Sequence, residues 1–397
     1  MTKDPHDTLL QMAAKDLFPG TRPYHDSEIP AAIARVSADP LFEPLVSKLF
    51  PDTPVEQFRQ EFLRISTIDE FQDKVMLKAI WSIVRKTCTD FTWDGFDNLD
   101  NNHRYMFVAN HRDILLDAAL LQIVLKGLHL RTSEITFGDN LMQGNIVIDI
   151  GKMNKMFRIV RGGAVHDFYR NSMEVSSYMR YALLEKGESV WIAQRNGRTK
   201  DGNDKTESAV LKMFSISSRA PFTENLGALN ITPVAISYEY EPCDFLKAQE
   251  LYVSQYQKYI KEPGEDRRSI LQGIIQPKGR VRLSVTPTIT TEELAECDRC
   301  EKNLKFERLA RIIDQRIYSH YSLWKTNYMA HDLLTGANTY RDRYTPEELG
   351  LFEERLQSGL AALVGDRDEL RSLLLKIYAT PIDNKTNKDT TTQTAHL

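Results

Sequence analysis

One stretch of the chain, from Tyr105 to Asp117, reads YMFVANHRDILLD. Its first part, Tyr105–Ala109, is a short apolar run that fits a buried strand, and Ile114–Lys126 then has the apolar spacing of a helix. A histidine, His111, lies where the predicted strand turns into the predicted helix. In open α/β sheets, ligands bind at this edge. The stretch therefore predicts an α/β fold with a candidate site at His111.

Further strand candidates follow this stretch and alternate with helical stretches. Strands alternating with helices predict a mainly parallel sheet flanked by helices on both faces. The segment Val281–Pro287 alternates and fits one more strand, at an edge of the sheet. The other strand candidates are Glu134–Phe137, Arg158–Arg161, Ser189–Ala193 and Ile231–Tyr238, with the clearest helices at Phe168–Lys186 and Glu207–Ser217.

The regions on either side of this α/β pattern read as helical. Apolar residues recur at helical spacing in Glu28–Ala38, Val55–Ile65 and Ile68–Arg85, and again in Phe306–Tyr321, Pro346–Leu363 and Asp368–Tyr378. The last stretch is almost devoid of apolar residues, which is typical of a disordered tail. We therefore predict a helical N-terminal region (1–95), an α/β catalytic domain (96–290), a helical C-terminal region (291–379) and a disordered tail (380–397).

Composition excludes some classes of function. The chain of 397 residues has a formal net charge of −4 and a pI of about 6.2. It therefore lacks the excess of basic residues that is typical of nucleic-acid-binding proteins. Of the four cysteines only Cys297 and Cys300 are close. One CxxC without a second pair favours free thiols over a zinc or redox site.

The sequence predicts at most a peripheral contact with a membrane. Met1–Phe18 lacks the pattern of a secretory signal, and no stretch approaches the roughly 18 to 20 apolar residues of a spanning helix. Asp69–Lys86 is a basic amphipathic helix with Trp81 and Lys78 among its residues. Such a helix either lies in a membrane interface or packs its apolar face on the next domain, and packing is the favoured reading. We expect a cytoplasmic protein, peripheral at the inner face of the membrane.

Local chemistry is concentrated in four clusters. His111 with carboxylates a few residues on can act as a general base, although a structural histidine at a helix start is the competing reading. Phe157–Gly163 places arginines before two glycines, and Trp191–Asn203 runs into a loop dense in Arg, Lys and Gly; both suit an anionic phosphate, and both also fit solvated surface. The fourth cluster is the apolar strand Ile231–Glu239 with a proline near its start.

The order and spacing of the four clusters resemble the glycerolipid acyltransferases, the family of glycerol-3-phosphate and lysophosphatidic acid acyltransferases. The resemblance covers residues 100 to 240 and is nearest to the bacterial glycerol-3-phosphate branch. The residues that carry it are His111-Arg112, the segment Gly138-Asp139-Asn140-Leu141, the Gly197-Arg198 pair, and Tyr238-Glu239 after the fourth cluster.

The resemblance implies a reaction and a set of roles. His111 would remove a proton from the acceptor hydroxyl as it attacks an acyl thioester, and a nearby aspartate, Asp117 or Asp113, would hold the imidazole. Arg161 and Arg158 would hold the acceptor's phosphate, with Asn196, Gly197 and Arg198 completing the anion site. The donor would be acyl-CoA or acyl carrier protein (acyl-ACP), and the acceptor glycerol 3-phosphate or a lysophospholipid. The activity would belong to phospholipid biosynthesis and would need no metal and no redox cofactor.

Two positions depart from the family pattern. The family's carboxylate comes five residues after the histidine, where this chain has Leu116. Asp117 is one residue late, and on a helix one residue rotates a side chain by about 100°, which a wide first turn or a π-bulge would absorb. We favour Asp117 over Asp113. Asn196 occupies the place of a family glutamate and lacks its charge.

These departures keep a second class of function open. A degenerate acyltransferase-fold protein would bind lipid or an acyl carrier without turnover. A carboxylate within about 3.2 Å of a His111 ring nitrogen would favour the active enzyme. A soluble α/β hydrolase is disfavoured because the chain has no Gly-x-Ser-x-Gly elbow.

Overall fold

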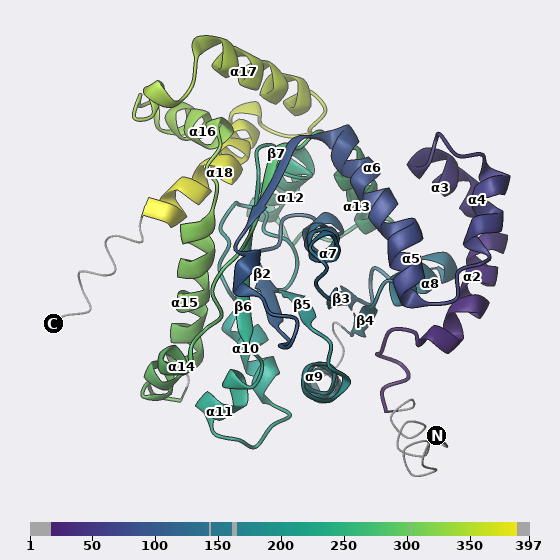
Figure 1. The fold of residues 1–397 in the computed structure, drawn as a ribbon. Helices are drawn as coiled ribbons and strands as arrows, with labels where there is room; N and C mark the ends of the chain where they lie inside the picture. The colour runs from purple at the N-terminus through teal and green to yellow at the C-terminus, as the bar shows by residue number, and fades with distance from the viewer. Residues whose placement is uncertain (1–16, 143, 161–164, 303, 387–397) are drawn as a thin grey trace, which may run out of the picture.

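A seven-stranded sheet lies at the centre of the computed structural model, which describes residues 17–142, 144–160, 165–302 and 304–386 (Figure 1). The strand order is β1-β7-β6-β2-β5-β3-β4. All neighbouring strands are parallel except β6 and β7. The mainly parallel α/β fold is therefore confirmed. The strands are β1 (Cys88–Asp94), β2 (Met106–Ala109), β3 (Glu134–Gly138), β4 (Met156–Ile159), β5 (Val190–Ala193), β6 (Ile231–Tyr238) and β7 (Gly279–Val285).

The central strands are apolar throughout because both faces of the sheet are covered. In β2, Phe107 and Ala109 face one hydrophobic core, while Met106 and Val108 face the other. The first core is covered by α6 (Leu77–Thr87) and α7 (Leu116–Gly127), with α13 (Glu265–Ile275) beside α6. The second core is covered by α9 (Val165–Tyr181), η4 (Ala182–Lys186), α10 (Ser208–Ser215), α11 (Phe222–Gly227), α14 (Thr291–Asp298) and α15 (Leu304–His320).

The N-terminal helices pack on one end of this sandwich through α8 (Asn145–Met153). Ile146 and Met153 of α8 are buried in an aromatic-rich cluster with the helices that precede the sheet. Arg35 and the buried Asp149 form an ion pair between the two parts, at 2.6 Å. The preceding elements are η1 (Asp26–Glu28), α2 (Ile29–Ala38), α3 (Phe42–Leu49), α4 (Val55–Phe62), α5 (Ile68–Phe71) and η2 (Gln72–Met76).

The C-terminal helices form a further cluster around α12 (Asp244–Tyr256), at the opposite end of the sheet in Figure 1. They are α16 (Lys325–Thr335), α17 (Pro346–Leu360) and α18 (Arg367–Thr386), and the short 3-10 turn η5 (Arg341–Arg343) lies between α16 and α17. Another 3-10 turn, η3 (Phe96–Asn98), lies between β1 and β2. The helical character of both terminal regions is confirmed, whereas the exact division of the chain into domains stays a prediction.

Three details differ from the sequence-based expectation. β1 was not predicted, and because it pairs with β7, the segment expected at an edge lies inside the sheet. β4 begins at Met156 rather than Arg158. The segment expected to start a disordered tail at residue 380 is helical up to Thr386, because Ile382 is buried and Lys385 donates to the Tyr321 carbonyl at 2.6 Å.

The basic amphipathic helix corresponds to α5, η2 and α6. Its residues Ile80 and Val84 are buried in the core beneath α7, and Leu77 and Trp81 pack against the same core. Of the two alternatives for this helix, the structure therefore shows packing on the neighbouring domain, because protein covers its apolar face. Within the described residues, no helix combines the length and the apolar character that crossing a membrane requires.

Candidate active site at the carboxyl end of strand β2

The turn after β2 is built by side chains that continue the sheet. Asn110 donates from Nδ2 to the Ile236 carbonyl at 3.0 Å, and its Oδ1 accepts from the Ile236 N–H at 2.8 Å. These contacts extend the hydrogen bonding between β2 and β6 by one residue beyond the end of β2. On the other side, the Thr199 N–H donates to the His111 carbonyl at 2.8 Å. His111 is thereby fixed between strand β6 and the loop of Thr199 at the carboxyl edge of the sheet, the edge at which ligands bind in such folds.

His111 and Asp117 form a buried pair. The His111 Nδ1 atom lies 2.9 Å from Asp117 Oδ2. The side chain of Asp117 is 1% exposed and that of His111 is 11% exposed. Because an ionised carboxylate only accepts hydrogen bonds, the contact places the imidazole proton on Nδ1 and leaves the Nε2 lone pair free. No described residue makes a hydrogen bond to Nε2. The pair therefore has the arrangement that a general base requires.

Asp113 has a different place from Asp117. Its Oδ1 accepts the N–H groups of Leu115 and Leu116, at 2.9 and 2.8 Å, and so caps the start of α7. The segment between His111 and Leu116 is a non-helical turn. The extra residue relative to the family spacing is absorbed in that turn, and no π-bulge is needed. Leu116, at the family's carboxylate position, is buried in the core.

The Asp117 carboxylate is surrounded by donors. Oδ2 also accepts the N–H groups of Arg112 and Asp113, at 2.6 and 2.9 Å. Oδ1 accepts the hydroxyl of Tyr238 at 2.8 Å. Four hydrogen bonds thus satisfy this buried carboxylate and hold it beside the imidazole of His111. Tyr238 belongs to the resemblance, but nothing in the sequence linked it to Asp117.

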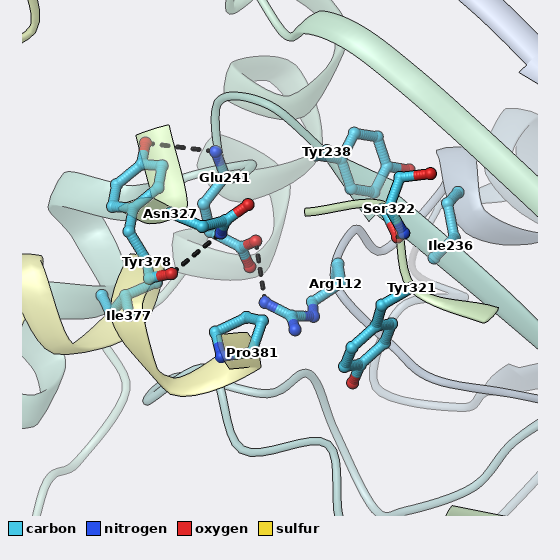
Figure 2. A pocket seen from close by; sticks show the side chains of 11 residues that line it. Arg112, Ile236, Tyr238, Glu241, Tyr321, Ser322, Asn327, Ile377, Tyr378 and Pro381 are labelled. Carbon is cyan, nitrogen blue, oxygen red and sulfur yellow. Dashed lines mark hydrogen bonds and ion pairs between the residues drawn. The ribbon is translucent and has the colours of Figure 1, made fainter. Parts of the chain in front are cut away.

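Arg112 turns away from His111 into a buried charged cluster. Its guanidinium contacts Asp204 at 2.6 Å and Glu241 at 3.0 Å. Burial alone would raise the pKa of Asp204, yet Arg112 and hydrogen bonds from Thr199 and Tyr321 hold that pKa below its usual range. Figure 2 shows Arg112 beside Glu241 at a small cavity of about 20 Å³. That volume suits a water molecule rather than a substrate. The buried charged cluster thus holds the turn between β2 and α7 on the side away from His111.

A larger pocket of about 330 Å³ lies next to the site, beside the loop that holds the His111 carbonyl. Arg198 and Lys200 line it on one side, and α12 and α13 enclose it on the other. Arg198 is 8% exposed and its Nη1 atom has no hydrogen-bond partner among the described residues. A buried cation with a free donor is suited to bind an anion.

Lys200 is the second cation of this pocket and belongs to the basic loop within Trp191–Asn203 that the sequence analysis considered for phosphate binding. It pairs with Glu250 of α12. Burial, and after it the charge of Arg198, lower the pKa of Lys200 to about 8, although the Glu250 carboxylate opposes the shift. The pocket therefore holds a cation whose charge changes close to neutral pH.

The remaining predicted site residues are less close to His111. Gly197, with φ +76°, begins the loop that leads to Arg198, whereas Asn196 is exposed. Arg158 lies on the edge strand β4, and β5 and β3 separate it from β2. At about 4.8 Å per strand this is ~14 Å, so Arg158 is not brought to the pair. Arg161 lies outside the described residues.

Helix α13 closes over the turn through a glycine. A Cβ added at Gly273 would lie less than 3.0 Å from the Oδ2 atom of Asp113, which caps α7, and 3.1 Å from its carboxyl carbon. That Oδ2 atom is buried and has no hydrogen-bond partner among the described residues. The helix approaches the turn as closely as it does because residue 273 has no side chain.

Replacing Gly273 by alanine is expected to lower the free energy of unfolding by about 1–2 kcal/mol. The steric cost of overpacking, ~1–3 kcal/mol, exceeds the gain in helix propensity of ~1 kcal/mol. Chemical denaturation measures the change. Gly350→Ala is the matched control, because Gly350 lies in α17 with no atom within 4 Å of an added Cβ. Equal stability changes for both variants would contradict the close approach.

Within the ranges that the structure describes, no group of three or more His, Cys, Asp or Glu side chains is placed to hold a metal ion. Cys297 is buried, Cys300 is half-buried, and both are free thiols.

Comparisons with known proteins bear on this region. Residues 90–237 match a family model described as Acyltransferase. Among curated proteins, none matches the chain. Among solved structures, the chain is similar to the crystal structure of the 1-acyl-sn-glycerophosphate (LPA) acyltransferase PlsC from Thermotoga maritima. The identity is 13%, the TM-score is 0.35, and the match covers 74% of this chain and 96% of that chain. At these values the likeness says nothing about individual side chains.

Proposed function

We propose, from the premise that residues 90–237 form a domain of the Acyltransferase family, that this protein transfers a fatty acyl group from a thioester to an acceptor hydroxyl. The observation that carries the proposal is the 2.9 Å contact between His111 Nδ1 and Asp117. This distance lies within the usual hydrogen-bond limit of about 3.2 Å, which supports the interpretation of His111 as an oriented base.

His111 acts as the general base in the proposed reaction. Its Nε2 atom takes the proton of the acceptor hydroxyl while the hydroxyl oxygen attacks the thioester carbonyl carbon. The carbon–sulfur bond then breaks, the proton passes to the leaving thiolate, and the products are an ester and a free thiol. Asp117 stabilises the imidazolium formed in between. Base assistance of this kind contributes about two to four orders of magnitude in rate.

The acceptor is proposed to carry a phosphate. Arg198 offers a free donor and Lys200 a second cation in the pocket of about 330 Å³ beside the site. A neutral alcohol would leave the free donor of Arg198 without an anionic partner, whereas Lys200 already pairs with Glu250. Glycerol 3-phosphate and 1-acylglycerol 3-phosphate are the acceptors that fit this chemistry, and Leu246, Val253 and Ile260 of the pocket wall are apolar enough to contact an acyl chain.

Acceptor binding is expected to weaken as pH rises through about 8, where Lys200 loses its proton. The KM for glycerol 3-phosphate should rise about tenfold above that pH, because a charged hydrogen bond to phosphate is lost. Steady-state kinetics from pH 6.5 to 9.5 measure the change.

A variant pair separates Lys200 from other titrations. Lys200→Gln should have the high KM at every pH, and Lys205→Gln, a neighbouring exposed lysine, should keep the wild-type profile. A KM that rises through pH 8 in Lys200→Gln as well would assign the titration to another group.

A second candidate function is binding of lipid or an acyl carrier without turnover. Leu116 and Asn196 favour it, because both depart from the family pattern. The Asp117 contact removes the first objection, since a carboxylate reaches the imidazole despite Leu116. Asn196 is exposed, so the charge that the family pattern has there is not missing from a buried position.

The donor is proposed to be acyl-CoA or acyl-ACP, and the protein is proposed to contact the cytoplasmic face of a membrane peripherally. Because the apolar face of α6 is covered, liposome binding should survive replacement of Lys78 and Trp81. Loss of sedimentation with liposomes in a folded Lys78→Gln variant would instead indicate that this helix contacts the membrane interface.

The proposed activity is tested with purified protein and a panel of substrates. Acyl-CoA and acyl-ACP are each offered with glycerol 3-phosphate, 1-acylglycerol 3-phosphate or glycerol, and thiol release is followed. We expect release that depends on a phosphorylated acceptor. Equal release with glycerol would contradict the phosphate site, and no release with any pair would favour binding without turnover.

A further inference from the structure

We propose that Tyr238 is a positioning residue for the His111–Asp117 pair, which limits how strongly Asp117 holds a proton on His111. The proposal rests on the proposed function for its meaning in catalysis, but its geometry stands on its own. The Tyr238 hydroxyl donates to Asp117 Oδ1 at 2.8 Å, on the side of the carboxylate away from His111.

The contact joins two elements that are far apart in the sequence. Tyr238 ends β6, the strand that pairs with β2, and Asp117 lies in the first turn of α7. Tyr238 is 6% exposed and Asp117 is 2% exposed. Without the phenol, Asp117 Oδ1 would be a buried acceptor with no partner, because all other donors lie on Oδ2.

The electrostatic consequence has a definite sign. A donor on Oδ1 draws charge away from Oδ2, so that Oδ2 attracts the imidazole proton less strongly. Burial, and after it the charge of Asp117, hold the pKa of Tyr238 well above its usual value. The phenol therefore stays protonated near neutral pH and remains a donor to Asp117. Its presence favours the neutral imidazole, which is the form that can act as a base.

The other charged groups around the phenol do not compete for this role. Asp113 and the Cys88 thiol lie near Tyr238, and both, like Asp117, act to keep the phenol protonated. Lys278 is near Asp113, but its ammonium group donates to Thr87 and to the Gln276 carbonyl. Trp191 packs edge-on against the His111 ring and carries no charge.

The test is Tyr238→Phe, which removes one hydroxyl. The midpoint of the His111 imidazole titration, followed by NMR, should move up by about half a unit to one unit, a three- to tenfold change in the protonation equilibrium. The acid limb of the pH profile of kcat should move with it. Activity lost at pH 6 should return at pH 8.5, with the acceptor KM unchanged. A packing defect would not be rescued by pH.

The matched control is Tyr178→Phe. Tyr178 is a buried tyrosine that donates to the Glu134 carboxylate at 2.6 Å, on α9 at the opposite face of the sheet. This variant loses the same kind of bond and should leave the His111 titration in place. His111→Gln identifies the His111 signal by its disappearance.

Two outcomes would overturn the proposal: an unchanged His111 midpoint in a folded Tyr238→Phe protein, or an equal shift in Tyr178→Phe. Should Tyr238→Phe fail to fold, site-specific Tyr238→3,5-difluorotyrosine supplies a stronger donor, and the midpoint should then move down. Since the NMR titration needs no substrate, an inactive wild-type protein would refute the proposed function while the Tyr238 proposal is still decided.

Discussion

Replacing His111 by alanine is expected to lower kcat for acyl transfer by about two to four orders of magnitude. The Nε2 atom is the acceptor that the buried pair with Asp117 leaves free, and alanine supplies no group in its place. The acceptor KM should change little, because the cations proposed to bind phosphate lie in the adjoining pocket. Initial rates of thiol release at saturating acceptor measure the loss.

His103→Ala is the control for this prediction. His103 contacts Asp100 at 3.1 Å, so the chain contains a second histidine–aspartate pair, but this one is exposed. It lies before β2, at the end of the strand opposite to His111. Its replacement should leave kcat unchanged. If both variants kept wild-type kcat, His111 would not be the base, whatever the geometry of the pair.

Replacing Arg112 by methionine is expected to lower the free energy of unfolding by about 3–5 kcal/mol. Arg112 contacts both Asp204 and Glu241, and these three side chains are buried. Methionine fills a similar volume but leaves Asp204 without its cation, while Glu241 keeps only Lys247. An unpaired carboxylate in a buried site costs more than the ion pair contributes. The shift in the denaturation midpoint measures the effect.

A surface ion pair provides the comparison. Arg282 of β7 contacts Asp94 of β1 at 2.7 Å, with both side chains about 40% exposed. Arg282→Met should lower the free energy of unfolding by no more than ~1 kcal/mol. Arg112→Met should also reduce acyl transfer, because Arg112 follows His111 directly and its N–H donates to Asp117 through a turn that the cluster fixes. Similar stabilities for the two variants would mean that the buried cluster does not hold the turn.

Much of the sheet could be predicted from the sequence because its central strands are buried on both faces. β2 and β6 are nearly continuous apolar runs, and such runs are typical of parallel strands under two layers of helices. β1 was not predicted because it is not buried on both faces. It reads CTDFTWD, is half-exposed at the edge, and has no apolar run to reveal it.

The candidate site could be predicted only where its residues are close in sequence. His111 and Asp117 lie six residues apart; the sequence favoured that pair over Asp113, and the structure places the two side chains 2.9 Å apart. The argument from helical rotation did not apply, because the residues between them form a turn that Asp113 caps. The favoured pairing thus held for a reason that only the turn geometry reveals.

Contacts that depend on tertiary packing could not be predicted from the sequence. Tyr238 lies 121 positions after Asp117, and Gly273 meets Asp113 from a helix that no sequence pattern connected to the site. Arg158 shows the opposite failure. It lies in a strand, β4, but strand order along the chain does not give strand order in the sheet, and β4 is at the far edge.

The central claim is that His111 directs an acyl group to an acceptor hydroxyl, and the most direct measurement is the identity of the acylated product. Wild-type protein and His111→Ala are incubated with an acyl thioester and either glycerol 3-phosphate or 1-acylglycerol 3-phosphate, and products are identified by mass spectrometry. The account predicts an ester of the acceptor, formed in equal amount to the released thiol, and absent with His111→Ala. Free fatty acid released regardless of acceptor, or ester formed equally by the variant, would contradict it.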